Sequence, residues 1–242
     1  MQRSKTAQTA VNSSKESSSK LIKSNSITPA QCPLSGCDQS LMASNFLQHY
    51  LRDHSSLSFI SIDDRETMLF HFEESAFPLN IPYCLGVLAY GGRQPGRPEQ
   101  QPVKQGYAVE NQFLPQRFKE LKNHLPVLVM ACRKVPLAAG ESVPQGDHDG
   151  GKNVSIVFWL LTMGTGSVQV VGYLSIGDLL LRHQRRRMVK VCELTNSSRE
   201  LPGIVCLAKE WNLLELNRSE IDLLSHDGTS LIKLEVMIDG PC

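Results

Sequence analysis

"LIKLEVMI", residues 231–238, alternates apolar and charged side chains in the two-residue period of an extended strand. Lys233 and Glu235 fall on one side of such a strand, and four apolar side chains fall on the other. These apolar positions are Ile232, Leu234, Val236 and Ile238. A strand with one polar and one apolar face is typical of a sheet that packs only one side onto a core.

Short segments of the same kind, rich in β-branched and aromatic residues, recur after residue 54 and are separated by glycine-containing turn signals. They are residues 59–62, 68–72, 125–131, 154–161, 168–176, 188–194, 203–208 and 231–238. One short helix is predicted at 218–224, with Ser219 as its cap and Asp222 in the reciprocal capping position. The chain is therefore predicted to be mainly β, with residues 56–242 folding as a sandwich of two antiparallel sheets.

Composition narrows the class of protein further. The 242 residues are 41% hydrophobic, so one main hydrophobic core is expected. The net charge is only +1, so the overall charge of the protein does not favour binding to nucleic acid or to an anionic membrane. An odd number of cysteines, seven, does not indicate a disulfide framework. No apolar run approaches the length of a membrane helix. We expect a soluble protein of the cytoplasm, the nucleus or both.

Two segments do not fit the strand pattern. Residues 1–29 contain eight serines and a net charge of +4, with few apolar side chains, and are predicted to be a disordered tail. Residues 91–123 include "GGRQPGRPEQQPVKQG" and are predicted to form a mobile inserted loop.

A possible metal site lies between the tail and the first strand. Cys32, Cys37, His49 and His54 follow the spacing C-x4-C-x11-H-x4-H. Two thiolates and two imidazoles form the donor set of a closed, tetrahedral zinc site. Ser44 is expected to cap a helix that carries both histidines. Residues 30–55 are therefore predicted to be a zinc finger that holds one structural Zn²⁺.

The finger does not look like a reader of DNA, because it is single and its charged side chains between the first cysteine and the last histidine are Asp38, Arg52 and Asp53. Nucleic-acid binding through the basic tail and the run Arg182–Arg187 remains an alternative, while that run could equally be a solvated strand end. The sequence contains no P-loop, serine-hydrolase elbow or dinucleotide-binding glycine motif. A non-catalytic protein is expected.

Three features in one order resemble a known family. The finger "CPLSGC…H…H" is followed by "YLSIGDLLLRHQRRRMVKVCEL" and by "LELNRSEIDLLSHDGTSLIKLEVMI". This arrangement resembles the C-terminal half of the seven-in-absentia (Sina/Siah) ubiquitin ligases over about residues 30–238. The resemblance implies a TRAF-like β-sandwich behind the finger. Family ligases also carry a RING domain upstream, whereas residues 1–31 contain no cysteine or histidine. Ligase activity of this chain alone is therefore not expected.

The resemblance also implies a function in protein binding. Family sandwiches bind an extended segment of the target, containing Pro and Val, beside an edge strand. Carried over onto this sequence, the groove positions are Ser58, Ile60, Met68, Ile81, Tyr83 and Leu85, with Tyr83 in place of a family tryptophan. The expected role is that of an adaptor in the ubiquitin pathway that binds a protein partner or a degron-like peptide. Pairing with itself or with Sina family members is a further expectation.

Overall fold

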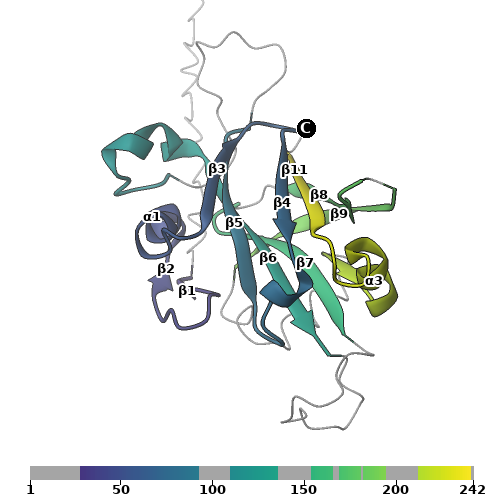
Figure 1. Cartoon of the computed structure of the whole chain (residues 1–242). Helices are drawn as coiled ribbons and strands as arrows, with labels where there is room; N and C mark the ends of the chain where they lie inside the picture. The colour runs from purple at the N-terminus through teal and green to yellow at the C-terminus, as the bar shows by residue number, and fades with distance from the viewer. Residues whose placement is uncertain are drawn as a thin grey trace, which may run out of the picture.

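The computed structural model describes residues 28–92, 110–135, 154–165, 169–180, 182–194 and 212–240 (Figure 1). The predicted tail up to residue 27, the predicted strand 203–208 and residues 93–109 of the predicted loop lie outside the described residues.

The described chain is mainly β, as predicted, and nine of its strands form one hydrogen-bonded sheet. The strand order is β3-β5-β6-β7-β9-β8-β11-β4, and β10 pairs with β7 beside this path. The strands are β3 Ser58–Ile62, β4 Thr67–Phe72, β5 Tyr83–Tyr90, β6 Leu125–Lys134, β7 Ser155–Thr162, β8 Val171–Asp178, β9 Gln184–Glu193, β10 Leu213–Leu216 and β11 Ile232–Asp239.

The sheet curves until its two end strands, β3 and β4, come together, so that it is nearly closed (Figure 1). Residues 63–66 connect these two strands directly. Nevertheless, β3 pairs only with β5, and β4 pairs only with β11, within the described part of the chain. We call this interruption between β3 and β4 the seam. It leaves a free strand edge on each side.

Strand pairing differs in part from the predicted pair of antiparallel sheets. β9 pairs with β8 in antiparallel and, through Val191–Glu193, with the end of β7 in parallel, which joins the two halves into one sheet. β3 and β5 are also parallel. They can be parallel because the chain between them runs back through β4, which lies at the other end of the strand order instead of between them in the sheet. A two-residue period predicts a strand without specifying which neighbour it pairs with.

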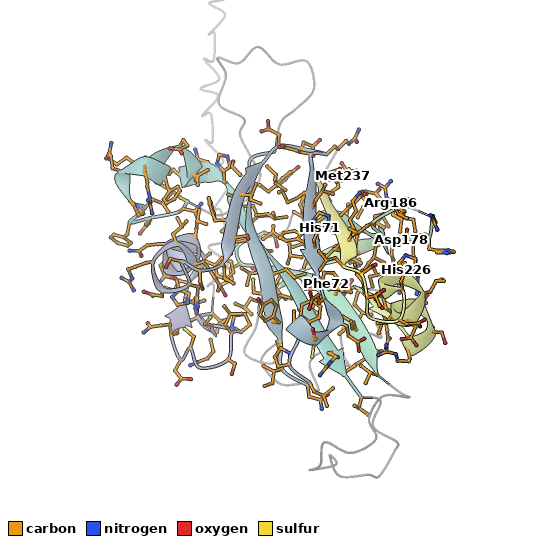
Figure 2. All side chains as sticks on the ribbon, viewed as in Figure 1. His71, Phe72, Asp178, Arg186, His226 and Met237 are labelled. Atoms are coloured by element: carbon orange, nitrogen blue, oxygen red, sulfur yellow. The ribbon has the colours of Figure 1, made fainter. Side chains whose placement is uncertain are left out.

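The core lies between the two curved halves of the sheet. Burial along β11 alternates strictly between buried and half-buried residues, which confirms the pattern seen in "LIKLEVMI". Phe72 from β4 meets Phe158 from β7 across the interior, with ring centroids 5.4 Å apart (Figure 2). Phe77 packs against both rings. These aromatic side chains tie the two halves together.

The predicted C-terminal helix is present as α3, Arg218–Ser225, but its cap was predicted wrongly. Asn217 is the N-cap residue, and its side chain accepts a hydrogen bond from the backbone N–H of Glu220. The Glu220 carboxylate accepts one in return from the Asn217 N–H. Asn217 is a better cap than a residue inside the first turn because it ends the strand-like approach with an extended backbone.

Several elements were not predicted. β5 and β10 were missing from the expected strands, and the short 3-10 helix η1 spans Glu74–Ala76. The predicted loop 91–123 contains local structure at its end, where Gln116–Asn123 form the 3-10 segment η2. Apolar burial explains this order, because Leu121 is buried and Phe118 packs edge-on against Phe59 of β3 at 5.5 Å.

Gly86 offers a test of how closely β3, β4 and β5 approach. A Cβ atom at this position would lie 2.8 Å from the Phe70 ring and 3.0 Å from the carbonyl oxygen of Ser58. We expect Gly86→Ala to lower the free energy of unfolding by about 1–3 kcal/mol, as overpacking does elsewhere. Urea denaturation would measure this loss.

Two variants make the test specific. Adding Phe70→Leu to Gly86→Ala should recover part of the loss, because it removes the ring that clashes. Ser61→Ala, an exposed change on β3, should alter stability by less than about 0.5 kcal/mol. A fully stable Gly86→Ala protein would contradict the described packing.

Candidate metal centre

A short hairpin positions the two cysteines. Its strands are β1, Ala30–Gln31, and β2, Ser40–Leu41. The N–H of Cys32 donates to the carbonyl of Gln39, and the N–H of Cys37 donates to the carbonyl of Leu34. Gly36 takes a φ of +77° between them, a conformation that suits glycine. The turn therefore brings both sulfur atoms to one side of the hairpin.

The helix α1, Ala43–Asp53, follows at once and carries His49 within it. Its cap was predicted wrongly, because Met42 is the N-cap residue and Ser44 lies inside the first turn. The Met42 N–H instead donates to the side-chain oxygen of Asn45 at 2.8 Å. His54 is the C-cap residue, so its backbone has already left the helical conformation when its ring turns back toward the hairpin.

The four predicted ligands come together at one point. Their ligand atoms all lie within 4.8 Å of one another. Nε2 of His54 lies 3.5 Å from Sγ of Cys32, and Nε2 of His49 lies 3.5 Å from Sγ of Cys37. The two Nε2 atoms are 3.1 Å apart. These residues, which we call the Cys/His cluster, could hold one metal ion.

A neighbouring carboxylate orients one of the imidazoles. Nδ1 of His49 lies 2.9 Å from Oδ2 of Asp53, one helical turn later. Hydrogen bonds from Arg52 hold the pKa of the Asp53 carboxyl down at about 2, so it stays ionised and accepts the Nδ1–H of His49. That proton position leaves the Nε2 lone pair free and aimed into the cluster, as in many metal-bound histidines.

Tyr50 supports the buried sulfur. Its hydroxyl lies 3.5 Å from Sγ of Cys32 and donates a hydrogen bond to that sulfur whenever it is a thiolate. Burial raises the pKa of the Cys32 thiol to about 11 and also raises that of the Tyr50 hydroxyl. A cation in the cluster would offset the cost of ionising the buried thiol.

Both imidazoles are suited to act as neutral ligands. Burial lowers the pKa of His49 and of His54 below the usual value for histidine. The neutral form, which has the lone pair that a metal needs, is therefore retained to lower pH than in a free peptide.

The residues around the cluster are not an independent unit. Phe46, Leu47 and Tyr50 of α1 belong to the same continuous apolar core as the sheet. Tyr50 and His54 also line a small pocket together with Phe59 of β3 and Val87 of β5. The position of the cluster is thus fixed against one end of the sheet.

The predicted groove residues lie around the seam. Ser58 and Ile60 are on β3, Met68 is on β4, and Ser58 pairs directly with Gly86 of β5. A Cβ atom at Gly86 would lie within about 3 Å of both the Phe70 ring of β4 and the carbonyl oxygen of Ser58 on β3. Strands β3, β4 and β5 therefore converge at Gly86.

The other three predicted positions lie on or just before β5. Ile81 and Tyr83 are 41% and 40% exposed, and Leu85 is half-buried at a bulge where the pairing of β5 with β6 shifts. The bulge interrupts the simple alternation expected from residue 81 to residue 85. Tyr83 packs against Phe77 with ring centroids 5.5 Å apart, so one face of its ring is held by the core.

The arginine run does not form one positive face. Arg185 donates to the Glu220 carboxylate of α3 at 2.6 Å. Arg186, which is labelled in Figure 2, is the next residue of β9, and strand alternation places its side chain on the other face. Its guanidinium carbon lies 4.6 Å from the centre of the Tyr173 ring. Both side chains therefore already have partners within the fold.

Sequence reasoning missed Asp53 and Tyr50 as supports of the cluster. The spacing of Asp53, four residues after His49, was a usable signal, because residues at i and i+4 of a helix face one another. The contact between Tyr50 and Cys32 joins residues 18 positions apart and leaves no such periodic signal.

A family model describes this chain. It is DUF4729, a domain of unknown function, and it matches residues 31–227. The chain belongs to the DUF4729 family. The matched region begins beside the Cys/His cluster and extends through α3, so it covers the cluster and the described strands β3 to β10, while β11 lies beyond its end. A search of curated proteins finds no match. No helix in the described part of this domain is long and apolar enough to cross a membrane.

The cluster predicts a stoichiometry that can be measured. Purified protein is expected to contain one metal ion per chain, and Cys37→Ser is expected to lose it, because three donors hold a metal far more weakly than four. Elemental analysis by plasma mass spectrometry measures both quantities. Cys192→Ser is the matched control, since Cys192 lies on β9 outside the cluster and should keep the metal. A metal-free wild-type protein would contradict the assignment.

Proposed function

We propose that the Cys/His cluster binds a structural Zn²⁺ ion. With bond lengths typical of zinc, a tetrahedral site places sulfur and nitrogen ligands about 3.6 Å apart and two nitrogens about 3.3 Å apart. The corresponding distances here are 3.5 Å and 3.1 Å. Four protein donors leave no open position for a catalytic water. The zinc would therefore serve to hold the hairpin and α1 together.

We further propose that the protein is a non-catalytic adaptor that binds an extended segment of a partner protein at the seam. The observation that supports this proposal is that one edge of β3 and one edge of β4 pair with no strand among the described residues. A free edge presents backbone donors and acceptors that an added strand can pair with. The exposed side chains of Ile81 and Tyr83 supply apolar contacts beside these edges.

The mode of binding proposed here is that of the Sina-type ligases, which the sequence resembles. Backbone pairing would give most of the affinity, while Tyr83 would select an apolar side chain of the bound segment. The half-buried Ile60 and Met68, on either side of the seam, would form the floor of the site. Self-association or pairing with Sina family members through the sheet belongs to the same proposal.

An adaptor of this kind has no ligase activity of its own. We expect the purified chain to form no ubiquitin chains with an activating enzyme and a panel of conjugating enzymes, because the described residues offer no second Cys/His cluster that could recruit them. An autoubiquitination assay tests this expectation. Robust chain formation would contradict the adaptor role.

Tyr83 gives the sharpest test of binding at the seam. Tyr83→Ala is expected to weaken binding of an extended Pro- and Val-containing peptide by about thirtyfold in Kd, equivalent to about 2 kcal/mol. Because the ring is 40% exposed, the melting temperature should fall only slightly. Calorimetric titration and thermal denaturation of the same preparation separate the two effects.

The control is Met188→Ala, which removes a more exposed apolar side chain from β9, far from the seam in strand order. It should leave the affinity unchanged. Unchanged affinity in a folded Tyr83→Ala protein would remove Tyr83 from the site.

A further inference from the structure

Residues 110–115, which come directly before η2, present a large apolar side chain to solvent. We call residues 110–115 the Phe113 loop. The Phe113 side chain is 74% exposed, more than any other large apolar residue in the described chain. Its backbone takes a φ of +58°, which is unfavourable for a bulky residue. An exposed phenylalanine in a strained backbone contributes nothing evident to folding.

Hydrogen bonds hold the loop in this conformation. Asn111 is buried, and its side-chain amide donates to the carbonyls of Leu121 and His124 at 2.8 and 2.7 Å. The Asn111 N–H donates to the carbonyl of Lys122. These bonds fasten the loop to both ends of the last turn of η2, so its start is rigid.

The residues on either side of Phe113 are also fixed. The N–H of Gln112 donates to the carbonyl of Ser44 in α1 at 2.7 Å. Leu114 packs against the core, and Phe118 of η2 packs against Phe59. Because its neighbours are held on both sides, Phe113 is presented in a preorganised position, and little ordering entropy is lost when it binds.

The charges beside Phe113 indicate the kind of partner. Lys119, Lys122 and Glu110 line one shallow hollow together with Phe113. Glu110 pairs with Lys122 at 2.7 Å, whereas Lys119 forms no ion pair with any of the described residues. The hollow therefore carries a positive charge next to an apolar anchor.

We propose that the Phe113 loop is a second docking surface, which inserts the Phe113 ring into an apolar pocket of a protein partner with an acidic rim. Large aromatic side chains at the centre of an interface commonly carry most of its affinity. Lys119 would pair with a carboxylate of the rim, which favours acidic partners and speeds their association. This surface is distinct from the seam and does not depend on peptide binding there.

Other occupants fit the loop less well. A membrane surface is bound by several basic and several apolar side chains together. Here one aromatic ring is accompanied by the acidic Glu110 and Glu120 among its basic neighbours. A second copy of the chain is not favoured either, because the hollow is positively charged on both copies. The test below distinguishes a membrane surface and a second copy of the chain from the proposed protein partner.

The test uses the full chain with the Tyr83→Ala change in every protein compared, so that peptide binding at the seam is weakened, and a phage-displayed library of random 16-residue peptides as the probe. Selected peptides are expected to combine aliphatic residues with Asp or Glu. Phe113→Gly should weaken their binding at least tenfold, since glycine removes the ring and tolerates the positive φ. For the same reason its melting temperature should be unchanged or higher. Lys119→Glu should weaken binding about threefold or more and reduce its dependence on salt.

Leu180→Ser is the matched control, since Leu180 is 62% exposed and follows β8. It should bind the selected peptides as the Tyr83→Ala parent does. Peptides without acidic residues, or peptides that bind Phe113→Gly equally well, would overturn the proposal. Two further outcomes would also overturn it, in each case with peptide binding unchanged. Phe113→Gly could abolish binding to vesicles that contain 30% phosphatidylserine, or it could abolish self-association measured by sedimentation equilibrium.

Discussion

The missing hydrogen-bond ladder between β3 and β4 is the constraint on which the rest of the structure depends. The two strands are consecutive in the chain and are joined by residues 63–66, yet each pairs away from the other. This arrangement curves one sheet almost into a closed shape and leaves its core filled from both halves by Phe72 and Phe158. It also leaves two edges that backbone groups of another chain could pair with. The proposed function follows from this single interruption.

The Cys/His cluster fixes the β1–β2 hairpin and α1, which lie beside the β3 side of that seam. Without cross-linking, a two-strand hairpin and an 11-residue helix bury little apolar surface of their own. Proposed zinc binding would lock them together, and Tyr50 would then connect the cluster to the core through its hydrogen bond with Cys32. The same helix receives Gln112 at the carbonyl of Ser44. The proposed metal would thus support the Phe113 loop as well as the edge of the sheet.

Local patterns in the sequence predicted elements better than their connections. Alternation in "LIKLEVMI" correctly placed the buried face of β11, and ligand spacing predicted the four residues of the cluster. The pairing of β9 with both β7 and β8 could not be predicted, because a strand's period is the same in parallel and antiparallel neighbours. The order in η2 also escaped prediction, because it depends on the contact of Phe118 with Phe59 across 59 residues of chain. The cap of α3 was predicted wrongly because Asn217 and Ser219 are both favourable cap residues and lie only two positions apart.

Amide hydrogen exchange of the full chain, with and without a bound Pro- and Val-containing peptide, tests the central claim most directly. Amides on a free strand edge exchange readily, and pairing with an added strand protects them. The account predicts that protection on binding concentrates in Ser58–Ile62 or Thr67–Phe72, with little change in β6 and β7, which already have partners on both sides. Saturating peptide that leaves β3 and β4 unprotected, while other surfaces become protected, would contradict it.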